Sequence, residues 1–303
     1  EESFIGSYIF DQVETIRSTK KYDIHIVKLS SFFSNERDYI YKGFNVSIFK
    51  LIDFPFFIFP GCFHAINKIR FENLLSIKNL QHLKICHAHV TYPAAYLISD
   101  MRCKKIVQHH GLDVLQLRNG RVSFLRHIQR KYLIRRSIKI LNQVDINIGV
   151  SSKVLESLSS FRTYHPKKDF VLYNGVDITK FYPIERKKDQ CFTIGCIGNF
   201  WKSKDHITLI KSVAILIRKN LDIRLRLIGS GRTLSECRQY VIDNNLTDVI
   251  SFEDEMPHDR LNNFYNEIDL FVLPSYDEAL GCVYLEAWAT NTPFIAVAGQ
   301  GIE

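Results

Sequence analysis

The sequence predicts an α/β protein made of two doubly wound domains, each a parallel sheet covered by helices on both faces. Short apolar segments rich in Ile, Val and Phe alternate with segments whose apolar residues recur at helical spacing. This alternation is typical of parallel strands joined by helices. A break in composition over residues 183–190, where the sign of the net charge also changes, separates two such series.

The first series occupies residues 1–183 and begins with a helix. Its predicted strands are 23–29, 84–87, 104–109, 145–150 and 170–172, and its predicted helices are 4–20, 65–80, 93–101 and 124–141. The second series occupies residues 190–303. Its predicted strands are 191–197, 223–228, 269–273 and 293–297, and its predicted helices are 204–219, 234–244 and 284–290. Ligands of such sheets bind beyond the carboxyl ends of the strands.

Both ends of the chain indicate an incomplete protein. No strand precedes the first predicted helix, and the sequence stops at residues 299–303, just after a predicted strand. We therefore expect the first strand of the first domain and the C-terminal part of the second domain to be missing.

Composition excludes several classes of protein. The 303 residues are 46% hydrophobic and 24% charged, which supplies enough apolar side chain for two cores and excludes disordered and collagen-like chains. The seven cysteines are odd in number and include no CxxC pair, which indicates a reducing, cytoplasmic compartment and disfavours a disulfide framework. The apolar run 51–63 is interrupted by Asp53, Pro55 and Pro60 and is shorter than the ~20 residues of a membrane helix.

The positive charge is concentrated in the first half. Residues 1–190 hold 30 Lys and Arg against 17 Asp and Glu, whereas residues 191–303 hold 10 against 15. The predicted helix 124–141 and the segment before it form a basic amphipathic stretch, a pattern that binds anionic lipid surfaces. The alternative is a solvated helix whose apolar stripe packs on the sheet. The cations of this stretch are Arg118, Arg121, Arg126, Arg130, Lys131, Arg135, Arg136 and Lys139.

Two acidic residues follow the predicted strand 269–273. Glu278 lies in a turn-rich loop, and Glu286 lies in the opening turns of a helix that begins near Gly281 or Cys282. A helix N-terminus offers free N–H groups and partial positive charge, which suit a phosphate or pyrophosphate. Glu286 beside it could accept hydrogen bonds from a polyol such as a ribose. Alternatively, Glu278 is a solvated loop residue and Glu286 only complements the helix dipole.

The spacing Glu278-x7-Glu286 resembles the E-x7-E signature of retaining glycosyltransferase family 4, which has the GT-B fold. Other segments resemble the same family in the same order, from about Gly6 to the last residue. They are His110-Gly111-Leu112-Asp113, Gly149-Val150-Ser151, Tyr173 to Asp177 with Phe181 and Pro183, Gly198 followed by Lys204, Gly229-Ser230-Gly231, and Gly299 to Glu303. The resemblance implies two Rossmann-like domains whose parallel sheets face a central cleft, the first accepting the acceptor and the second binding the nucleotide-sugar.

The sequence departs from this family at the donor site. Ala279 and Leu280 replace the usual glycine and phenylalanine after the first glutamate, while the second glycine, Gly281, remains. Asn199 stands where the family often has an arginine that binds phosphate, and Lys202 is a candidate to replace that cation.

The resemblance assigns roles to individual residues. Lys204 would neutralise the departing nucleoside diphosphate, where charge develops in the transition state. Glu286 would bind the ribose hydroxyls, Glu278 the hydroxyls of the donor sugar, and His110 the sugar near its anomeric centre. The remaining donor-binding candidates are Gly198, Asn199, Lys202, Gly229, Leu280, Gly281, Cys282 and Val283.

The implied activity is transfer of a sugar, with retention, from a UDP- or GDP-sugar to a hydroxyl of a glycan or lipid-linked acceptor. By analogy this belongs to cell-surface polysaccharide or lipopolysaccharide synthesis at the inner face of the membrane. We expect no further cofactor and no nucleic acid partner, since no nucleic-acid-binding motif is present. We also expect no metal, because Asp-x-Asp is absent and because His87 with His89, or His109 with His110, supplies only two ligands where zinc needs three or four. The alternatives are a non-catalytic nucleotide-sugar-binding module and a GT-B nucleotide-sugar epimerase.

Overall fold

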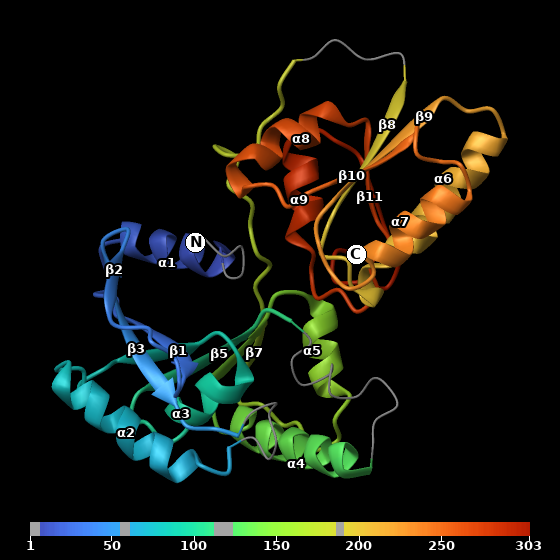
Figure 1. The fold of residues 1–303 in the computed structure, drawn as a ribbon. Coiled ribbons are helices and arrows are strands. Elements are labelled where there is room, and N and C mark those ends of the chain that lie inside the picture. Colours follow the sequence, from blue (N-terminus) through green and yellow to red (C-terminus); the bar gives the residue numbers. More distant parts are fainter. Residues whose placement is uncertain (1–6, 55–60, 112–123, 186–190) are drawn as a thin grey trace. The chain divides into compact units, whose positions relative to one another are not determined.

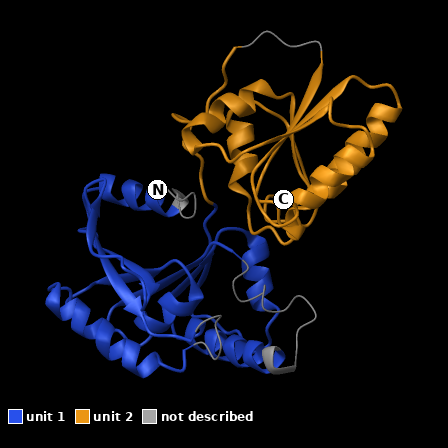
Figure 2. Cartoon of the chain, in the orientation of Figure 1, with its two compact units in different colours: residues 1–173 blue, residues 174–303 orange. Residues whose placement is uncertain are grey.

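The computed structural model describes residues 7–54, 61–111, 124–185 and 191–303. Its contacts divide the chain into two compact units, residues 1–173 (unit 1) and residues 174–303 (unit 2), which Figure 2 shows in different colours. Each unit is an α/β structure with its own buried apolar core, as the alternation of segments predicts.

Unit 2 is a parallel five-stranded sheet in the order β10-β9-β8-β11-β12. Helices α6 and α7 lie on one face of the sheet, and α8 and α9 lie on the other (Figure 1). The strands are β8 (Phe192–Ile197), β9 (Ile223–Ile228), β10 (Ile250–Glu253), β11 (Leu270–Leu273) and β12 (Phe294–Ala296). The helices are α6 (His206–Arg218), α7 (Leu234–Asp243), α8 (Leu261–Glu267) and α9 (Cys282–Ala289), with 3-10 turns η3 (Lys202–Lys204) and η4 (His258–Arg260).

Unit 1 contains two sheets in its described part. One has the order β1-β3-β2, and the other is parallel with the order β4-β5-β6-β7. The strands are β1 (Ile26–Ser31), β2 (Tyr39–Tyr41), β3 (Phe44–Leu51), β4 (Ile85–Ala88), β5 (Lys104–His109), β6 (Ile146–Gly149) and β7 (Asp169–Val171). The helices are α1 (Ser7–Ser18), α2 (His64–Ile77), α3 (Tyr96–Ile98), α4 (Phe124–Leu141) and α5 (Ser152–Ser159), with a π turn η2 (Thr91–Ala95).

One strand of unit 1 departs from the parallel arrangement that the sequence predicts. β2 runs antiparallel to β3, with Tyr41 opposite Phe44. The two residues between them, Lys42 and Gly43, both have positive φ, at 46° and 83°. Two-residue loops with positive φ at both positions suit the twist of a hairpin, so this local turn fixes the antiparallel pairing.

The boundary between the units lies between Tyr173 and Asn174, earlier than the expected boundary at 183–190. Three contacts attach the segment after Tyr173 to unit 2. Phe181 is 2% exposed within the unit 2 core, Tyr182 N–H donates to Asn262 Oδ1 at 2.9 Å, and Ile184 N–H donates to Asn266 Oδ1 at 2.7 Å. The composition break therefore follows the structural boundary.

Close packing of α8 on the unit 2 sheet requires a glycine in the central strand. A Cβ at Gly195 of β8 would lie 2.5 Å from Ile268 Cδ1 and 2.7 Å from the Phe264 ring. Interiors packed at crystal-like density do not accept an added carbon at such distances. Gly195 therefore lets the helix lie directly on the sheet.

Most of the predicted helices and strands are confirmed, although the first or last residue of several differs from the prediction. Strands 104–109 and 223–228 and helix 124–141 have the predicted bounds. The predicted helix 93–101 is instead a π turn followed by one short helical turn, and helix α6 begins two residues after Lys204. The elements that the sequence interpretation missed are β2, β3, β10, α5 and α8.

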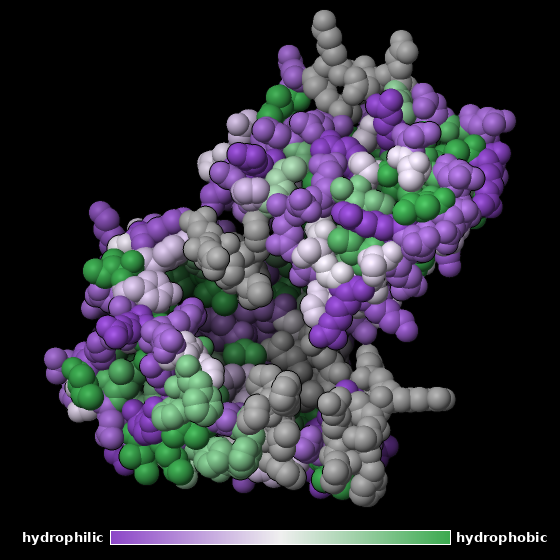
Figure 3. Space-filling model, viewed as in Figure 1, coloured by the Kyte–Doolittle hydropathy of each residue, from purple (hydrophilic) through white to green (hydrophobic). Residues whose placement is uncertain are grey.

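The surface of the described part mixes polar and apolar residues. On the face drawn in Figure 3, hydrophilic residues cover most of unit 2 and hydrophobic residues are interspersed among them. Among the described residues, every helix is too short or too polar to cross a lipid bilayer.

Candidate functional site

The candidate donor site lies at the carboxyl edge of the unit 2 sheet, where two glycines bring adjacent backbones into contact. Gly198 follows β8, and Gly229, with φ of 140°, follows β9. A Cβ at Gly229 would lie 2.3 Å from the Gly198 carbonyl oxygen. Gly198 N–H also donates to the Ile228 carbonyl at 3.1 Å, so the two turns form one surface.

The turn after β8 carries the candidate cations. Phe200 N–H donates to the Ser230 carbonyl at 2.7 Å, which fixes the turn between the exposed side chains of Asn199 and Lys202. Lys204 N–H donates to the Trp201 carbonyl at 2.9 Å. Lys204 is therefore the last residue of η3 and not the first residue of a long helix, as the sequence had predicted.

Lys204 and Glu278 form an ion pair in the structure. Lys204 Nζ lies 2.5 Å from Glu278 Oε2, and Ser275 Oγ donates to the same oxygen at 2.9 Å. Tyr276 N–H donates to the Ser203 carbonyl at 2.8 Å, which ties the loop after β11 to the turn after β8. The side chains of the pair are 27% and 15% exposed, so a ligand from solvent can reach both.

The loop between Glu278 and α9 turns at a glycine that no other residue replaces without strain. Gly281 has φ of 82°, and a Cβ there would lie 2.6 Å from the Tyr284 ring. Ala279 and Leu280, the residues that depart from the family pattern, are buried. The apolar replacements therefore fill the inner side of the loop, and the half-buried Cys282 and Val283 form the first turn of α9.

Glu286 lies one turn further along α9 and is held by two donors. It is 7% exposed. Tyr265 Oη donates to Glu286 Oε2 at 2.8 Å, and His258 Nε2 lies 3.1 Å from Glu286 Oε1. Burial raises the pKa of Tyr265 well above its usual value, and the carboxylate adds to this shift, so Tyr265 remains a donor.

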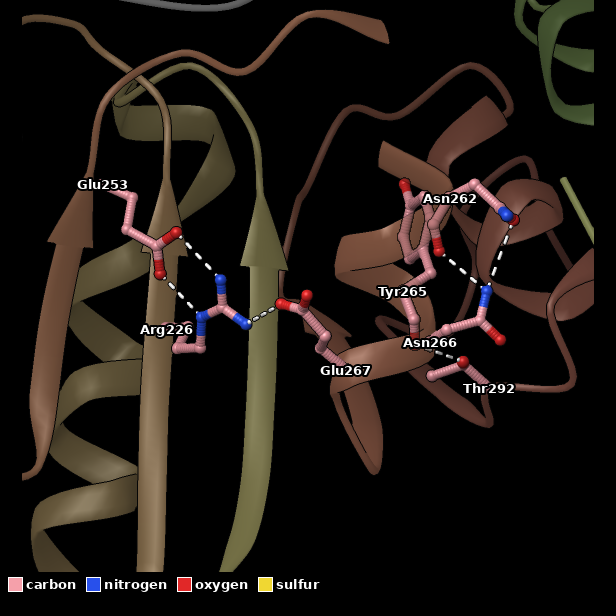
Figure 4. A network of polar contacts seen from close by, with 7 residues as sticks. All are labelled: Arg226, Glu253, Asn262, Tyr265, Asn266, Glu267 and Thr292. Atoms are coloured by element: carbon pink, nitrogen blue, oxygen red, sulfur yellow. Dashed lines mark hydrogen bonds and ion pairs between the residues drawn. The ribbon is translucent and has the colours of Figure 1, made fainter. Parts of the chain in front are cut away.

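A polar network anchors α8, the helix that carries Tyr265 (Figure 4). Arg226 of β9 makes ion pairs with Glu253 of β10 and Glu267 of α8, each at 2.7 Å. At the other side of the helix, Thr292 Oγ1 donates to the Tyr265 carbonyl at 2.7 Å. Helix α8 is thus held from two sides.

In unit 1 the carboxyl ends of β4 and β5 carry four histidines. They are His87, His89, His109 and His110. The rings of His89 and His110 are stacked at 5.1 Å, with His89 Nδ1 and His110 Nε2 at 2.9 Å, and the His87 ring stacks on His89 at 4.3 Å. His109 is buried, with its Nδ1 3.3 Å from Thr91 Oγ1.

Burial keeps these imidazoles uncharged. It lowers the pKa of His89 to about 3, with a smaller effect of the neighbouring His87 and His110, and lowers the pKa of His109 and His110 to about 4. A neutral imidazole carries one N–H donor and one acceptor nitrogen. His110 therefore offers hydrogen bonding without charge, and one of the two nitrogens in its contact with His89 donates while the other accepts.

Comparison with known families identifies the chain. Residues 6–180 match the model described as Glycosyltransferase Family 4, and residues 191–303 match the model described as Glycosyl transferases group 1. The chain belongs to glycosyltransferase family 4.

Individual relatives of this family 4 chain are distant. An uncharacterized glycosyltransferase of Methanocaldococcus jannaschii is 25% identical over 99% of this chain and 77% of its own. The O-antigen chain mannosyltransferase RfbU of Salmonella typhimurium is 29% identical over 57% of this chain and 47% of its own. The chain thus spans about half the length of RfbU in that match.

Solved structures support the GT-B fold of this family 4 chain. Sucrose-phosphate synthase of Thermosynechococcus elongatus has a TM-score of 0.76 at 18% identity, covering 97% of this chain and 76% of its own. The Anabaena protein HepE, in complex with UDP and glucose, has a TM-score of 0.61 at 15% identity, covering 86% of this chain and 69% of its own. At these identities the likeness concerns the fold alone.

The structure brings some of the predicted site residues of the family 4 chain together. Lys204 contacts Glu278, and Gly198 contacts Gly229, all in unit 2, whereas His110 belongs to unit 1 and contacts His89. Asp113 lies outside the described residues. Sequence reasoning missed the two partners of Glu286, because Tyr265 and His258 precede it by 21 and 28 residues in no motif that we had singled out.

The basic helix α4 is only partly described. Lys131, Arg135 and Lys139 are exposed at four-residue intervals and form one cationic stripe. Arg136 instead points into unit 1, where it donates to the Gly61 carbonyl at 2.9 Å and lies over the Tyr96 ring. The side chains of Arg118, Arg121 and Arg126 lie outside the described residues.

The candidate metal ligands give no metal site in the part of the chain that the structure describes. No group of three or more His, Cys, Asp or Glu side chains there has an arrangement that could hold an ion.

Proposed function

We propose that this family 4 chain transfers a sugar, with retention of the anomeric configuration, from a UDP- or GDP-sugar to a hydroxyl of a glycan or lipid-linked acceptor. The observation that carries the proposal is the ion pair between Lys204 and Glu278, placed beside the N-terminus of α9. A cation, a carboxylate and free helix N–H groups in one place match a diphosphate joined to a polyol.

The cation and the helix N–H groups stabilise the leaving group. When the bond between the anomeric carbon and the diphosphate oxygen breaks, negative charge grows on the diphosphate. Lys204 and the N–H groups of Cys282 and Val283 stabilise that charge more strongly in the transition state than in the bound donor. Donor binding inserts phosphate oxygens next to Lys204 and thereby weakens its contact with Glu278.

The two carboxylates bind the sugar and the nucleoside. Glu278, released from Lys204, accepts hydrogen bonds from hydroxyls of the donor sugar, and Glu286 accepts them from the ribose. His110 contributes a neutral imidazole to the sugar near its anomeric carbon. We assign no nucleophile of the protein. The acceptor hydroxyl attacks the anomeric carbon on the same face as the departing diphosphate and passes its proton to a diphosphate oxygen, which accounts for retention.

The acceptor belongs, in this proposal, to cell-surface polysaccharide synthesis. The name of the Salmonella relative, an O-antigen chain mannosyltransferase, supports this assignment. The stripe of Lys131, Arg135 and Lys139 supports peripheral contact with an anionic membrane, at about 1 kcal/mol per cation near the surface.

A panel of nucleotide-sugars tests the function. We expect release of UDP or GDP from one donor in the presence of a lipid-linked acceptor, and an unchanged rate in EDTA because no step needs a metal. Glu286→Ala and Lys204→Ala should abolish most of the release, with exposed Lys219→Ala as a control. Binding of UDP and GDP without turnover would favour the non-catalytic module, conversion of the donor sugar would favour the epimerase, and no binding would reject all three.

A further inference from the structure

His258 is a second residue at the proposed ribose carboxylate. It opens η4, directly after Pro257, and its side chain is 32% exposed, whereas that of Glu286 is 10% exposed. The imidazole therefore lies between the buried carboxylate and solvent. Its Nε2 is 3.1 Å from Glu286 Oε1, within hydrogen-bond distance.

One buried aromatic ring contacts both this imidazole and Tyr265. The Phe181 ring lies edge-on to His258 at 5.1 Å and edge-on to Tyr265 at 6.0 Å. Phe181 is 2% exposed and comes from the segment that joins unit 2 at Asn174. This segment is tied to α8, since Asn266 Nδ2 donates to the Tyr182 carbonyl at 3.0 Å. One buried ring thus supports both donors of Glu286.

Each of the two donors contacts a different oxygen of the Glu286 carboxylate. Tyr265 donates to Oε2 from the buried side, and His258 contacts Oε1 from the exposed side. A carboxylate held at both oxygens cannot rotate, and each oxygen still has a second lone pair to accept a hydroxyl. An orientation fixed before the ligand arrives removes the cost of ordering it on binding.

We propose that His258 is the positioning residue that orients Glu286 toward the vicinal hydroxyls of the donor ribose. The inference rests on the proposed function, because it takes Glu286 as the ribose carboxylate. His258 donates its Nε2–H to Oε1, and the carboxylate then receives the 2′- and 3′-hydroxyls. His258 acts through Glu286 and need not touch the nucleotide.

The test compares UDP and GDP with their 2′,3′-dideoxy analogues, by titration calorimetry on the full chain. The unaltered chain should bind the ribonucleotide more tightly than its dideoxy analogue, and Glu286→Gln should reduce that preference. His258→Ala should weaken ribonucleotide binding about tenfold, the usual worth of a hydrogen bond to a charged group, and leave the dideoxy analogue unaffected. His258→Gln, which retains an N–H donor, should recover most of the loss.

The control is His165→Ala, which removes an exposed histidine of unit 1 and should change neither affinity. If His258→Ala weakens both nucleotides equally, or neither, the inference is wrong while the proposed function stands. If the unaltered chain binds neither UDP nor GDP, the proposed function fails and the inference fails with it. Far-ultraviolet circular dichroism of each variant separates lost binding from lost folding.

Discussion

The carboxyl edges of the β4-β5-β6-β7 sheet of unit 1 and of the unit 2 sheet differ in the charge of the side chains that they carry. In unit 1, His89 and His110 are half-buried, stacked and neutral. In unit 2, Lys204 and Glu278 are charged and paired, and Glu286 is held by two donors. Similar positions at the ends of parallel strands thus hold uncharged hydrogen-bonding groups in unit 1 and an ion pair in unit 2.

Removing the Lys204 cation of unit 2 should have the largest effect, a loss of turnover. Lys204→Ala should lower turnover about 10²- to 10³-fold, the usual cost of losing one group that stabilises developing charge. Steady-state release of nucleoside diphosphate measures this loss. Lys204→Ala with an unchanged rate would remove Lys204 from the mechanism, and Lys219→Ala controls for a general loss of positive charge.

The second-largest effect is expected from a substitution at the contact between the turns of Gly198 and Gly229. Gly229→Ala places a Cβ against the Gly198 carbonyl at a φ that suits glycine, and should destabilise unit 2 by about 2–3 kcal/mol. Both tryptophans, Trp201 and Trp288, lie in unit 2, so tryptophan fluorescence during urea unfolding reports on this unit.

Gly175→Ala is the matched control for that variant. A Cβ at Gly175 would meet no atom within 4 Å, so its stability should stay within about 0.5 kcal/mol of the unaltered chain. Equal destabilisation by the two substitutions would contradict the close approach of the turns.

Acid should destabilise unit 1 more than unit 2. Unit 1 holds His89, His109 and His110 with lowered pKa, whereas unit 2 holds His206, whose pKa burial lowers to about 4. Because the native state keeps these groups neutral, their contribution is complete above about pH 6.5 and is lost as the pH falls toward 4.

Urea unfolding at pH 7.5 and pH 5.0 measures the difference. Circular dichroism reports on both units, and tryptophan fluorescence reports on unit 2. We expect the dichroism transition to move by about 2 kcal/mol more than the fluorescence transition, given about 1.4 kcal/mol per unit of pKa. Equal shifts would mean that the unit 1 histidines are not held neutral.

The smallest effect is expected from a substitution of Glu278, which should change nucleotide binding and sugar transfer in opposite directions. Glu278→Gln removes the charge that competes for Lys204 and should tighten binding of UDP or GDP about threefold, as expected for a partly exposed ion pair. The same variant should transfer sugar more slowly, because the amide replaces a carboxylate acceptor. Weaker binding of the diphosphate would show that Glu278 assists the cation.

Local patterns were sufficient to predict most of the architecture. Strands such as β5 and β9 are short apolar runs between polar turns, and their bounds were predicted correctly. β3 was missed, although Phe44, Val46 and Ile48 alternate with Asn45 and Ser47, because an apolar run follows directly and hides the alternation. β10 has only four residues, too few for a periodic signal.

The sequence predicted those residues of the candidate site that belong to a motif, but not the partners that they contact in the fold. The spacing of Glu278 and Glu286 identified both carboxylates, and the glycines marked the turns that need them. The partners of Glu286 depend on how η4 and α8 pack against α9, which is tertiary information. The pairing of Lys204 with Glu278 likewise depends on two loops that meet only in the folded sheet.

The central claim is that a nucleoside diphosphate binds at the carboxyl edge of the unit 2 sheet. Amide hydrogen exchange of the full chain, with and without UDP or GDP, tests it most directly. We predict slower exchange in residues 198–204 and 278–286, with the strands of unit 1 unchanged. Protection confined to other segments, or no protection at saturating nucleotide, would contradict the account.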